Sequence, residues 1–599
     1  MNNSVHLSFA QFFKVKEMQP YLFALSKKMF DGHLCVGVNE LPNYPEFWTD
    51  WSEAIPSCLK FDVNWPYIGT SDNPNQPFIL HKEFLYTGRS FFYETKIIEK
   101  IKDFAKVDEN SLNKRRSKLI ENKDFLRAFH QNNQQTDWQF VAAIVGYMNN
   151  LTLVTGGPGT GKTTTVAKIL ATINTLEPNF KLALAAPTGK AGTRMKESLL
   201  NTVNDPRNAH LNLKELVEKV EPKTIHSLLG SKGQESTFFK HNEENPLEAD
   251  VIVIDESSMI GAALFAKLLM AVENGKRIIL LGDPNQLASV ESGSLFGDLC
   301  RSAKENENKF NASDFELLNE LLPESNFLDE NAKITTSKNV LDGKIVRLTK
   351  TYRYDEGSQI DLFTRAVTEG KADDLSGILA LGSDSLRLDE TYNEKLFQEF
   401  VMDYSEYIDE KDIAEALKKL NFLRVLCSVR EGDQGIYAIN RKIENVLKKA
   451  GKLEVREGFY HNQPIMVTKN TPSIGLMNGD VGIVRKDKNG QLRAYFPTTK
   501  THTDPTLPQG IVGINPVLIN DWETVFAMTI HKSQGSEFDA VLVLLPNQTT
   551  SRLLTRELLY TAITRAKKHA FIQANLELLK VATSQQVQRV SGLNHRIKF

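Results

Sequence analysis

The segment GGPGTGKTTT, at positions 156–165, carries the strongest chemical signal in the chain. It matches the spacing G-x-x-x-x-G-K-[ST], follows the apolar run at 151–154 and opens a helix-like stretch. Glycines at this spacing let backbone N–H groups face phosphate oxygens, and a helix start adds the positive end of a dipole. The pattern therefore predicts a site for Mg-ATP. The residues expected to hold the nucleotide are Gly157, Pro158, Gly159, Thr160, Gly161, Lys162, Thr163 and Thr164.

Within this segment, Lys162 is expected to reach the β- and γ-phosphates, and the hydroxyl of Thr163 to bind Mg²⁺. Two carboxylates follow a second apolar run, in VIVIDESS at 251–258. We expect Asp255 to hold the Mg²⁺ shell and Glu256 to orient and deprotonate the attacking water. A strand that ends in two solvated acids is the alternative. The position of these two acids, about ninety residues after the phosphate loop, favours the catalytic interpretation.

A third strand-like run, RIILLGDPNQL at 277–287, also ends in polar residues. Gln286 is a candidate sensor of the γ-phosphate, and Asp283 is a candidate helix cap. A two-lobed motor also needs cations that reach ATP from its second lobe and neutralise charge on the transferred phosphoryl group. Arg353, in LTKTYRY, and Arg565, in ITRAKK, are the candidates.

Composition limits the function classes. The net charge of −2 argues against a protein that coats nucleic acid everywhere, but a motor needs only a local basic groove. The four cysteines are far apart, which argues against a disulfide framework, a zinc ribbon and a cysteine-ligated iron–sulfur cluster. The first residues lack a secretory signal pattern, and no apolar run is long enough to span a bilayer. We expect a cytoplasmic protein without membrane association.

The alternation of short apolar runs with helix-like stretches from position 151 onward predicts a doubly wound α/β fold, with ligands beyond the carboxyl ends of the strands. For 599 residues we expect about three to five domains. The expected organisation is a mixed, mostly helical N-terminal domain (1–130) and two α/β domains (131–344 and 345–599). A small β-barrel inserted in the second is expected at about 455–524, and an insertion or mobile loop at 301–343. The charged stretch 106–125 is expected to be a solvated helix face.

The order of the motifs resembles that of superfamily 1 helicases. The residues within the motifs resemble those of the RecD family, the alpha subunit of bacterial exodeoxyribonuclease V (RecBCD). The resemblance runs from about Asp137 to Phe571. The motifs that carry it are GGPGTGKTTT, AAPTGKA, TIHSLLG, VIVIDESSM, GDPNQL, KTYR, MTIHKSQGSEFD and YTAITRAKK.

The resemblance implies roles for further residues. Gln139 matches the glutamine that reads adenine in these helicases, and Glu537 lies in a motif that contacts the ribose of ATP. Other matching positions line the single-stranded DNA track, and these are Pro187, Thr188, His226, Ser227, His531, Lys532 and Ser533. The family also implies 5′ to 3′ translocation on single-stranded DNA.

The family further implies that the two α/β domains (131–344 and 345–599) are RecA-like and that the N-terminal domain (1–130) docks on other subunits. It also implies work on double-strand DNA ends for recombinational repair, in a heterotrimer with the beta (RecB) and gamma (RecC) subunits. The short stretch before Gln139 favours this complex-forming branch over stand-alone helicases, which carry a longer N-terminal extension. We find no constellation of acids and lysine typical of a metal nuclease, an activity that belongs to the beta subunit. The alternatives are a stand-alone superfamily 1 helicase, a P-loop ATPase that is not a motor, and a structural subunit with a vestigial ATP site.

Overall fold

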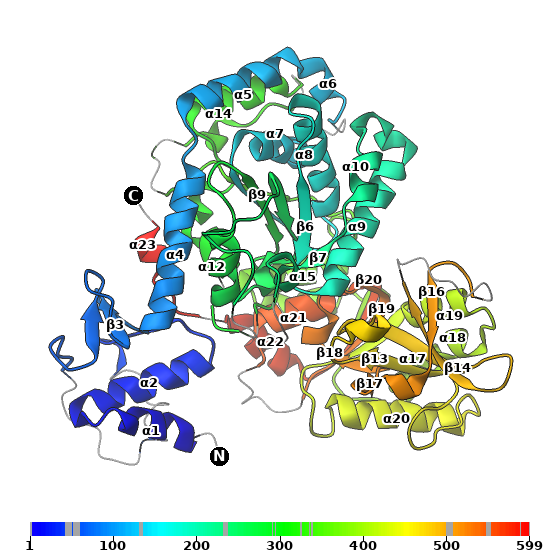
Figure 1. Ribbon diagram of the computed structural model, residues 1–599. Coiled ribbons are helices and arrows are strands. Elements are labelled where there is room, and N and C mark those ends of the chain that lie inside the picture. The colour runs from blue at the N-terminus through cyan, green and yellow to red at the C-terminus, as the bar shows by residue number, and fades with distance from the viewer. Residues whose placement is uncertain are drawn as a thin grey trace.

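The computed structural model describes residues 3–41, 51, 60–130, 136–231, 238–289, 291–293, 295–323, 326–334, 336, 339–498, 507–546, 553–587 and 589–597. Figure 1 shows three bodies: an N-terminal domain at the lower left, a first lobe at the top, and a second lobe at the lower right. No helix in the described residues combines the length and the apolar character needed to cross a membrane.

The first lobe is built on a six-stranded parallel sheet with the strand order β10-β5-β9-β8-β6-β7. Its strands are β5 (Leu151–Thr155), β6 (Leu182–Ala186), β7 (Lys223–Thr224), β8 (Val251–Ile254), β9 (Arg277–Gly282) and β10 (Ile345–Arg347). Because β10 pairs with β5, this sheet extends three residues past the expected boundary at 344. The central strands are apolar throughout because both faces of the sheet are covered.

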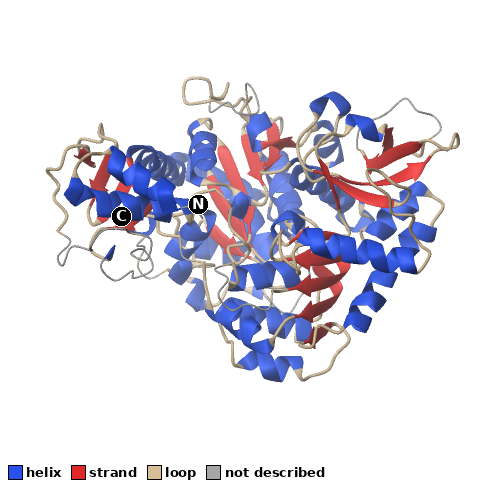
Figure 2. Ribbon diagram, turned by 90° about the horizontal axis from the view of Figure 1, so that it is seen from below, coloured by secondary structure: helices blue, strands red, loops and turns tan. Residues whose placement is uncertain are grey.

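Helices cover both faces of this sheet, which Figure 2 shows from below. Alternate residues of one strand enter two separate cores: Val251 and Val253 pack in one, Ile252 and Ile254 in the other. The helices of this lobe are α5 (Glu109–Glu121), α6 (Lys123–Arg127), α7 (Trp138–Met148), α8 (Lys162–Leu176), α9 (Gly189–Asn204), α10 (Lys214–Lys219), α11 (Ile225–Leu228), α12 (Ala262–Met270), α13 (Leu295–Ser302) and α14 (Ala312–Leu321).

The second lobe has a five-stranded parallel sheet with the order β11-β20-β19-β12-β18. The strands are β11 (Leu386–Asp389), β12 (Leu423–Cys427), β18 (Ala527–Thr529), β19 (Phe538–Leu544) and β20 (Ala566–Gln573). The helices are α15 (Gln359–Glu369), α16 (Asp374–Leu379), α17 (Glu394–Met402), α18 (Ser405–Asp409), α19 (Ile413–Leu420), α20 (Ile436–Lys449), α21 (Arg556–Ile563) and α22 (Leu576–Ser584). Two parallel α/β sheets are thus confirmed.

An antiparallel sheet is inserted between β12 and β18 of the second lobe. Its strands are β13 (Gln463–Val467), β14 (Val481–Lys486), β15 (Leu492–Pro497), β16 (Ile511–Ile514) and β17 (Trp522–Thr524). In the sheet they lie in the order β16-β15-β14-β13-β17. In the described residues no pairing joins β16 to β17, so the unit is an open sheet where a closed barrel was expected.

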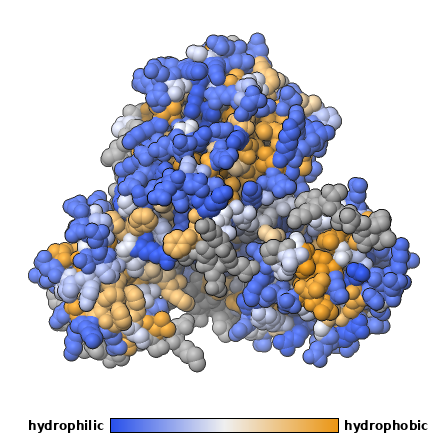
Figure 3. All heavy atoms as spheres, in the orientation of Figure 1, coloured by the Kyte–Doolittle hydropathy of each residue, from blue (hydrophilic) through white to orange (hydrophobic). Residues whose placement is uncertain are grey.

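The N-terminal domain combines helices and strands, which confirms its expected mixed character. It contains α1 (Asn3–Phe12), α2 (Gln19–Phe30) and a four-stranded sheet of β1 (Cys35–Gly37), β4 (Phe84–Thr87), β3 (Phe78–His81) and β2 (Ile68–Thr70). Helix α4 (Gly88–Ala105) then leads from this domain to the first lobe and packs against α12. Apolar residues gather on the outer face of the domain in Figure 3, and Phe12 and Phe30 are 77% and 72% exposed.

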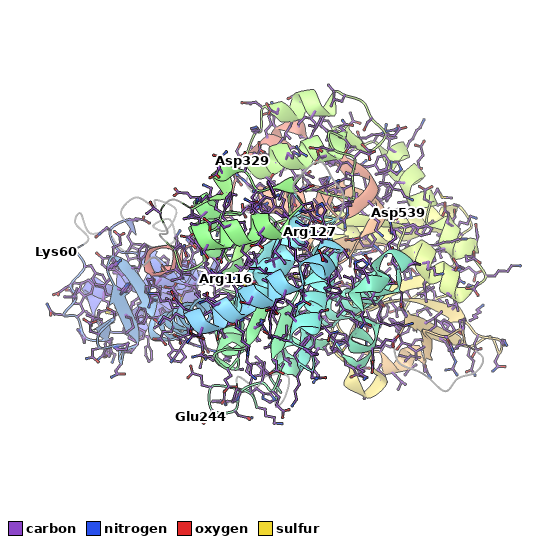
Figure 4. All side chains as sticks on the ribbon, turned by 90° about the horizontal axis from the view of Figure 1, so that it is seen from above. Lys60, Arg116, Arg127, Glu244, Asp329 and Asp539 are labelled. Carbon is purple, nitrogen blue, oxygen red and sulfur yellow. The ribbon has the colours of Figure 1, made fainter. Side chains whose placement is uncertain are left out.

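The expectation of a mobile loop at 301–343 is wrong for the described part of that segment, whereas its interpretation as an insertion stays a prediction. It contains all of α14, whose Phe315, Leu318 and Leu321 pack in the first-lobe core. Arg116 of α5 pairs with Asp314 at 3.0 Å, and α5 and α6 lie beside α14 in Figure 4. The segment reads as polar because only one face of this amphipathic helix enters the core.

The last described residues cross back to the N-terminal domain. After α22, residues 589–597, including α23 (Leu593–Arg596), contact both α4 and α13. The backbone of Leu34 donates to the carbonyl of Val590 at 3.0 Å, and Ser591 donates to Asp298 at 2.7 Å. The chain therefore ties its end to its beginning and to the first lobe.

Candidate active site

A cavity of about 1010 Å³ lies between the two lobes, beyond the carboxyl ends of the first-lobe strands. Both lobes contribute to its walls. The expected site residues that line it are Gln139, Pro158, Gly159, Gly161, Lys162, Thr163, Thr164, Asp255, Glu256, Gln286, Arg353, Glu537 and Arg565. The fold thus collects residues that are spread over more than four hundred positions of the sequence.

The phosphate loop connects β5 to α8. Gly159 and Gly161 have φ angles of +79° and +83°, a region that favours glycine because a Cβ is strained there. A Cβ on Gly161 would lie 2.3 Å from Nε2 of Gln139. Lys162 begins α8 and donates to the carbonyls of Gly156 and Gly157 at 2.8 and 3.1 Å. The ammonium group therefore lies over the loop whose backbone is predicted to hold phosphates.

Gln139 lies in the first turn of α7, and its buried side chain reaches the phosphate loop. Its Nε2 donates to the carbonyl of Thr160 at 3.3 Å, while its Oε1 is buried with no hydrogen-bond partner in the described residues. A buried amide oxygen without a donor is costly, and the exocyclic amino group of adenine is a donor of the type it lacks. The residues present therefore fit an adenine nucleotide at this position.

Asp255 and Glu256 follow β8 directly. Burial, and then the charge of Glu256, raise the pKa of Asp255 to about 7. Glu256 itself has a φ of +49°, a strained conformation for a residue with a Cβ, of the kind that often occurs at functional sites. A divalent cation would offset the crowded negative charge. The hydroxyl of Thr163 and the carboxylate of Asp255 are oxygen donors of the class that Mg²⁺ prefers, so these residues fit that ion.

Gln286 shares its hydrogen-bond acceptor with a tyrosine of the second lobe. Its Nε2 donates to Oδ2 of Asp283 at 3.0 Å, and the same oxygen accepts from the hydroxyl of Tyr560, on α21, at 2.9 Å. Oδ1 of Asp283 accepts from the backbone of Asn285 at 3.0 Å, so Asp283 caps this turn as well. Asp283 is thus a junction between the lobes.

Arg353 and Arg565 both line the cavity, but they are held differently. The backbone at Tyr352 donates to the carbonyl of Gly159 at 2.8 Å, which places Arg353 against the phosphate loop. The guanidinium of Arg353 pairs with Glu537 and donates to the carbonyl of Thr564 at 2.6 Å. Arg565 is 2% exposed and donates to the carbonyls of Thr561 and Ser536, each at 3.1 Å.

Four of the predicted DNA contacts lie at the ends of neighbouring first-lobe strands. Ala186 of β6 pairs with Thr224 of β7, which brings the segments 187–188 and 226–227 side by side. Thr188 caps α9 by accepting from the backbone of Ala191 at 3.2 Å. Both His226 and Ser227 are exposed. These positions form a polar edge next to the cavity.

The other three predicted DNA contacts follow β18 in the second lobe. Lys532 pairs with Glu523 at 2.8 Å, and Ser533 is buried, with its hydroxyl donating to the carbonyl of Ile530 at 2.7 Å. Burial, and then the charge of Arg589, lower the pKa of His531. In this conformation Ser533 supports the turn, whereas His531 and Lys532 are partly accessible.

Comparison with known proteins gives a consistent assignment. An AAA domain model matches residues 139–292, and a UvrD-like helicase C-terminal domain model matches residues 524–572. The RecBCD enzyme subunit RecD of Haemophilus influenzae is 30% identical over 580 residues, which cover 91% of this chain and 84% of that protein. The corresponding subunit of Mycolicibacterium smegmatis is 33% identical over 474 residues, covering 77% of this chain and 74% of that protein. The chain belongs to the RecD family.

Two further comparisons show weaker similarity. The ATP-dependent RecD2 DNA helicase of Deinococcus radiodurans is 25% identical over 456 residues, covering 75% of this chain and 50% of that protein. A solved structure of two coordinating Pif1 helicases on forked DNA covers 77% of this chain and 94% of that chain, with 17% identity and a TM-score of 0.38. We base no assignment on a likeness of that degree.

Sequence reasoning missed several residues in or next to the cavity of this RecD-family chain, and three of them stand out by their contacts. Arg194, on α9, donates to the carbonyl of Gly535 across the lobes. Tyr560 donates to Asp283, and Tyr352 lines the cavity beside the phosphate loop. Tyr560 and Tyr352 stand inside motifs that we recognised, but their side chains gain a role only from partners elsewhere in the chain. No sequence signal distinguishes Arg194 from an ordinary cation on a helix.

Proposed function

We propose that this RecD-family protein is an ATP-driven 5′ to 3′ translocase and helicase on single-stranded DNA, and that it is the alpha subunit of an exodeoxyribonuclease V complex. One observation carries the motor part of the proposal. A single cavity is lined by the phosphate-loop residues of the first lobe and by Arg565 and Glu537 of the second. A ligand that bridges both walls would couple its own chemistry to movement between the lobes.

The residues divide the work of hydrolysis. Lys162 and the glycine-rich backbone bind and orient the phosphates, and Thr163 with Asp255 would hold Mg²⁺, which supplies charge neutralisation on the β- and γ-phosphates. Glu256 takes the proton of the attacking water. Arg353 and Arg565 stabilise charge on the transferred phosphoryl group, and Gln286 senses its presence through Asp283.

Movement along DNA would follow from a contact between the lobes that lies close to the predicted DNA contacts of each. Gly535, two residues after Ser533, accepts from Arg194 on the helix that Thr188 caps. When the cleft opens or closes, the predicted DNA contacts of one lobe must shift relative to those of the other. Grip through phosphates and base stacking would give little sequence preference.

The decisive experiment measures ATP hydrolysis by the purified chain with and without single-stranded DNA, and then unwinding on duplexes with 5′ or 3′ overhangs. We expect strong stimulation by DNA and unwinding from the 5′ overhang only. A rate that DNA does not change would favour a P-loop ATPase that is not a motor. No hydrolysis under any condition would favour a vestigial site.

The subunit part of the proposal rests on the relatives named RecBCD enzyme subunit RecD, and on the apolar face of the N-terminal domain. Val5, Phe12 and Phe30 are 63%, 77% and 72% exposed, and large apolar side chains gathered on one face are typical of interaction sites. We expect co-purification with the beta and gamma partners, and its loss in a Phe12→Asp, Phe30→Asp variant that still hydrolyses ATP. Unchanged co-purification of that variant would contradict docking through this face, whereas full unwinding activity without any partner would favour a stand-alone helicase.

A further inference from the structure

Glu537 occupies an unusual position in the cleft. It immediately precedes β19, lines the cavity, and accepts a hydrogen bond from the guanidinium of Arg353. The family resemblance assigns this position to the ribose of ATP. The structure instead pairs its carboxylate with the arginine that is predicted to act on the γ-phosphate.

The walls of the cavity carry more positive than negative side chains. In the part of the chain that the structure describes, six cations line it, and these are Lys162, Arg194, Arg353, Arg565, Lys567 and Lys568. Four carboxylates of the same part line it, and these are Glu197, Asp255, Glu256 and Glu537. Two of the four, Asp255 and Glu256, follow β8, where Mg²⁺ and the attacking water are expected. Glu537 is the carboxylate that the second lobe contributes.

Three arginines converge on the short segment that carries Glu537. Arg194 donates to the carbonyl of Gly535, Arg565 to that of Ser536, and Arg353 to Glu537 itself. Burial lowers the pKa of both Arg194 and Arg565, which reflects the cost of placing their charges away from water. Backbone carbonyls compensate only part of that charge. Carboxylates offset the rest: Glu537 acts on both arginines, and Glu256 acts on Arg565 more strongly than Glu537 does.

Several of these cations act on the same carboxylate. Burial by itself would raise the pKa of Glu537, but the charges of Arg353 and Arg565, followed by Lys567 and Arg194, lower it. Glu537 is therefore an anion surrounded by the groups that a triphosphate would also attract. A nucleotide and this carboxylate compete for the same positive charge.

We propose that Glu537 is an internal counter-ion that takes the place of the nucleotide phosphates when the cleft is empty, and that it acts on the reaction by positioning Arg353. This inference rests on the proposed function, because it assumes that the cavity binds ATP and ADP. On binding, the phosphates draw Arg353 away from Glu537. On release, Glu537 recovers Arg353 and so weakens the hold on the product.

The test compares nucleotide binding by the full-length wild-type chain and by Glu537→Gln, which keeps the shape but removes the charge. We expect Glu537→Gln to bind Mg-ADP about tenfold more tightly, the size of effect that one charge in a half-buried site produces. KM for ATP and kcat of DNA-stimulated hydrolysis should both fall, because product leaves more slowly. A ribose contact predicts the opposite, with weaker binding and a higher KM.

Pyrophosphate, which lacks a ribose, separates the two roles. The affinity for Mg-pyrophosphate should rise in Glu537→Gln by the same factor as the affinity for Mg-ADP. Loss of a ribose contact would instead leave the affinity for pyrophosphate unchanged. Glu537→Asp, which keeps the charge, should stay close to wild type. Glu248→Gln is the matched control, because Glu248 pairs with Lys181 at 2.9 Å on an exposed surface outside the cavity.

The outcomes are distinguishable from failure of the proposed function. If the wild-type chain binds neither Mg-ADP nor Mg-ATP, the proposed function itself fails. If the wild type binds and Glu537→Gln binds equally or more weakly, only the counter-ion role is overturned. Glu537→Ala, which also removes the charge, replaces the glutamine variant if that variant does not fold, and the same expectations apply.

Discussion

Two carboxylate–arginine pairs in this protein are held in opposite ways. Glu94 is fully buried, and its carboxylate accepts from the hydroxyl of Tyr86 at 3.1 Å, the backbone of Gly592 at 3.0 Å and Arg596 at 3.0 Å. Glu537 instead pairs with Arg353 at the wall of an open cavity, among cations that outnumber the carboxylates. The carboxylate of Glu94 has all its hydrogen-bond donors within one buried region. The pair of Glu537 and Arg353 lies among side chains that a bound ligand would rearrange.

The difference teaches how burial separates a structural ion pair from a functional one. Removing one partner of a buried, fully bonded pair leaves an uncompensated charge and destabilises the fold. Around Glu537, the same kind of pair lies where solvent and ligand have access, so its rupture costs less and can be coupled to binding. We therefore expect mutations around Glu94 to change stability, and mutations around Glu537 to change catalysis or affinity.

The largest expected effect is on the catalytic side of this comparison. Arg565→Ala should lower kcat by about a thousandfold or more, because an arginine that stabilises charge on the transferred phosphoryl group contributes that much. The measurement is DNA-stimulated hydrolysis at saturating Mg-ATP, with the melting temperature as a check on folding. Arg207→Ala is the control, since Arg207 is a surface residue that pairs only with Asp205 in the described structure. A kcat within tenfold of wild type would refute the role of Arg565.

The structural side should respond in stability. Glu94→Ala should reduce the free energy of unfolding by about 3–5 kcal/mol, because Arg596 is left buried without its partner. Denaturant unfolding measures this, and Glu248→Ala, at an exposed pair, should cost less than about 1 kcal/mol. We expect hydrolysis per folded molecule to stay near the wild-type value. A small loss of stability together with a large loss of kcat would show that the two regions are not separate.

Packing around the Glu94 pair offers a sharper test. A Cβ on Gly592 would lie 2.0 Å from the hydroxyl of Tyr86 and 2.8 Å from Oε1 of Glu94. Gly592→Ala should therefore destabilise the protein by about 1–3 kcal/mol, the usual cost of overpacking. Gly377 lies inside α16 with no atom within 4 Å of an added Cβ. Gly377→Ala should stabilise by about 0.5–1 kcal/mol, so the two substitutions are expected to have opposite signs.

The smallest expected effect on catalysis concerns the hydrogen bond between Tyr560 and Asp283. Tyr560→Phe removes a donor of the second lobe from a carboxylate of the first, worth about 1 kcal/mol, while Gln286 keeps its own bond. We expect KM for ATP to rise by about fivefold with kcat nearly retained, because closure of the cleft becomes less favourable. A steady-state titration with ATP decides it. An unchanged KM would mean that this bond does not contribute to closure.

The strands of the two lobes were largely predictable because a short local pattern of residue types marks each of them. The runs that became β5, β8 and β9 are short, apolar and followed by polar residues, which is the pattern of strands buried on both faces. The segment around α14 was misjudged because its apolar residues are spread over one helix face. The inserted strands were recognised individually, but whether they close into a barrel depends on pairing between distant segments, which no local pattern specifies.

By itself, the sequence determined the elements and the types of side chain at their ends: the phosphate loop, the acids after β8, and the two arginines. These follow from short-range patterns, in which spacing and residue type fix backbone conformation and hydrogen-bonding capacity. Only the tertiary structure decided that Arg353 pairs with Glu537, that Asp283 joins Tyr560, and that the chain end encloses Glu94. Such pairings depend on which surfaces the fold brings within hydrogen-bond distance, because Coulombic and hydrogen-bond energies depend on distance in space and not on separation along the chain.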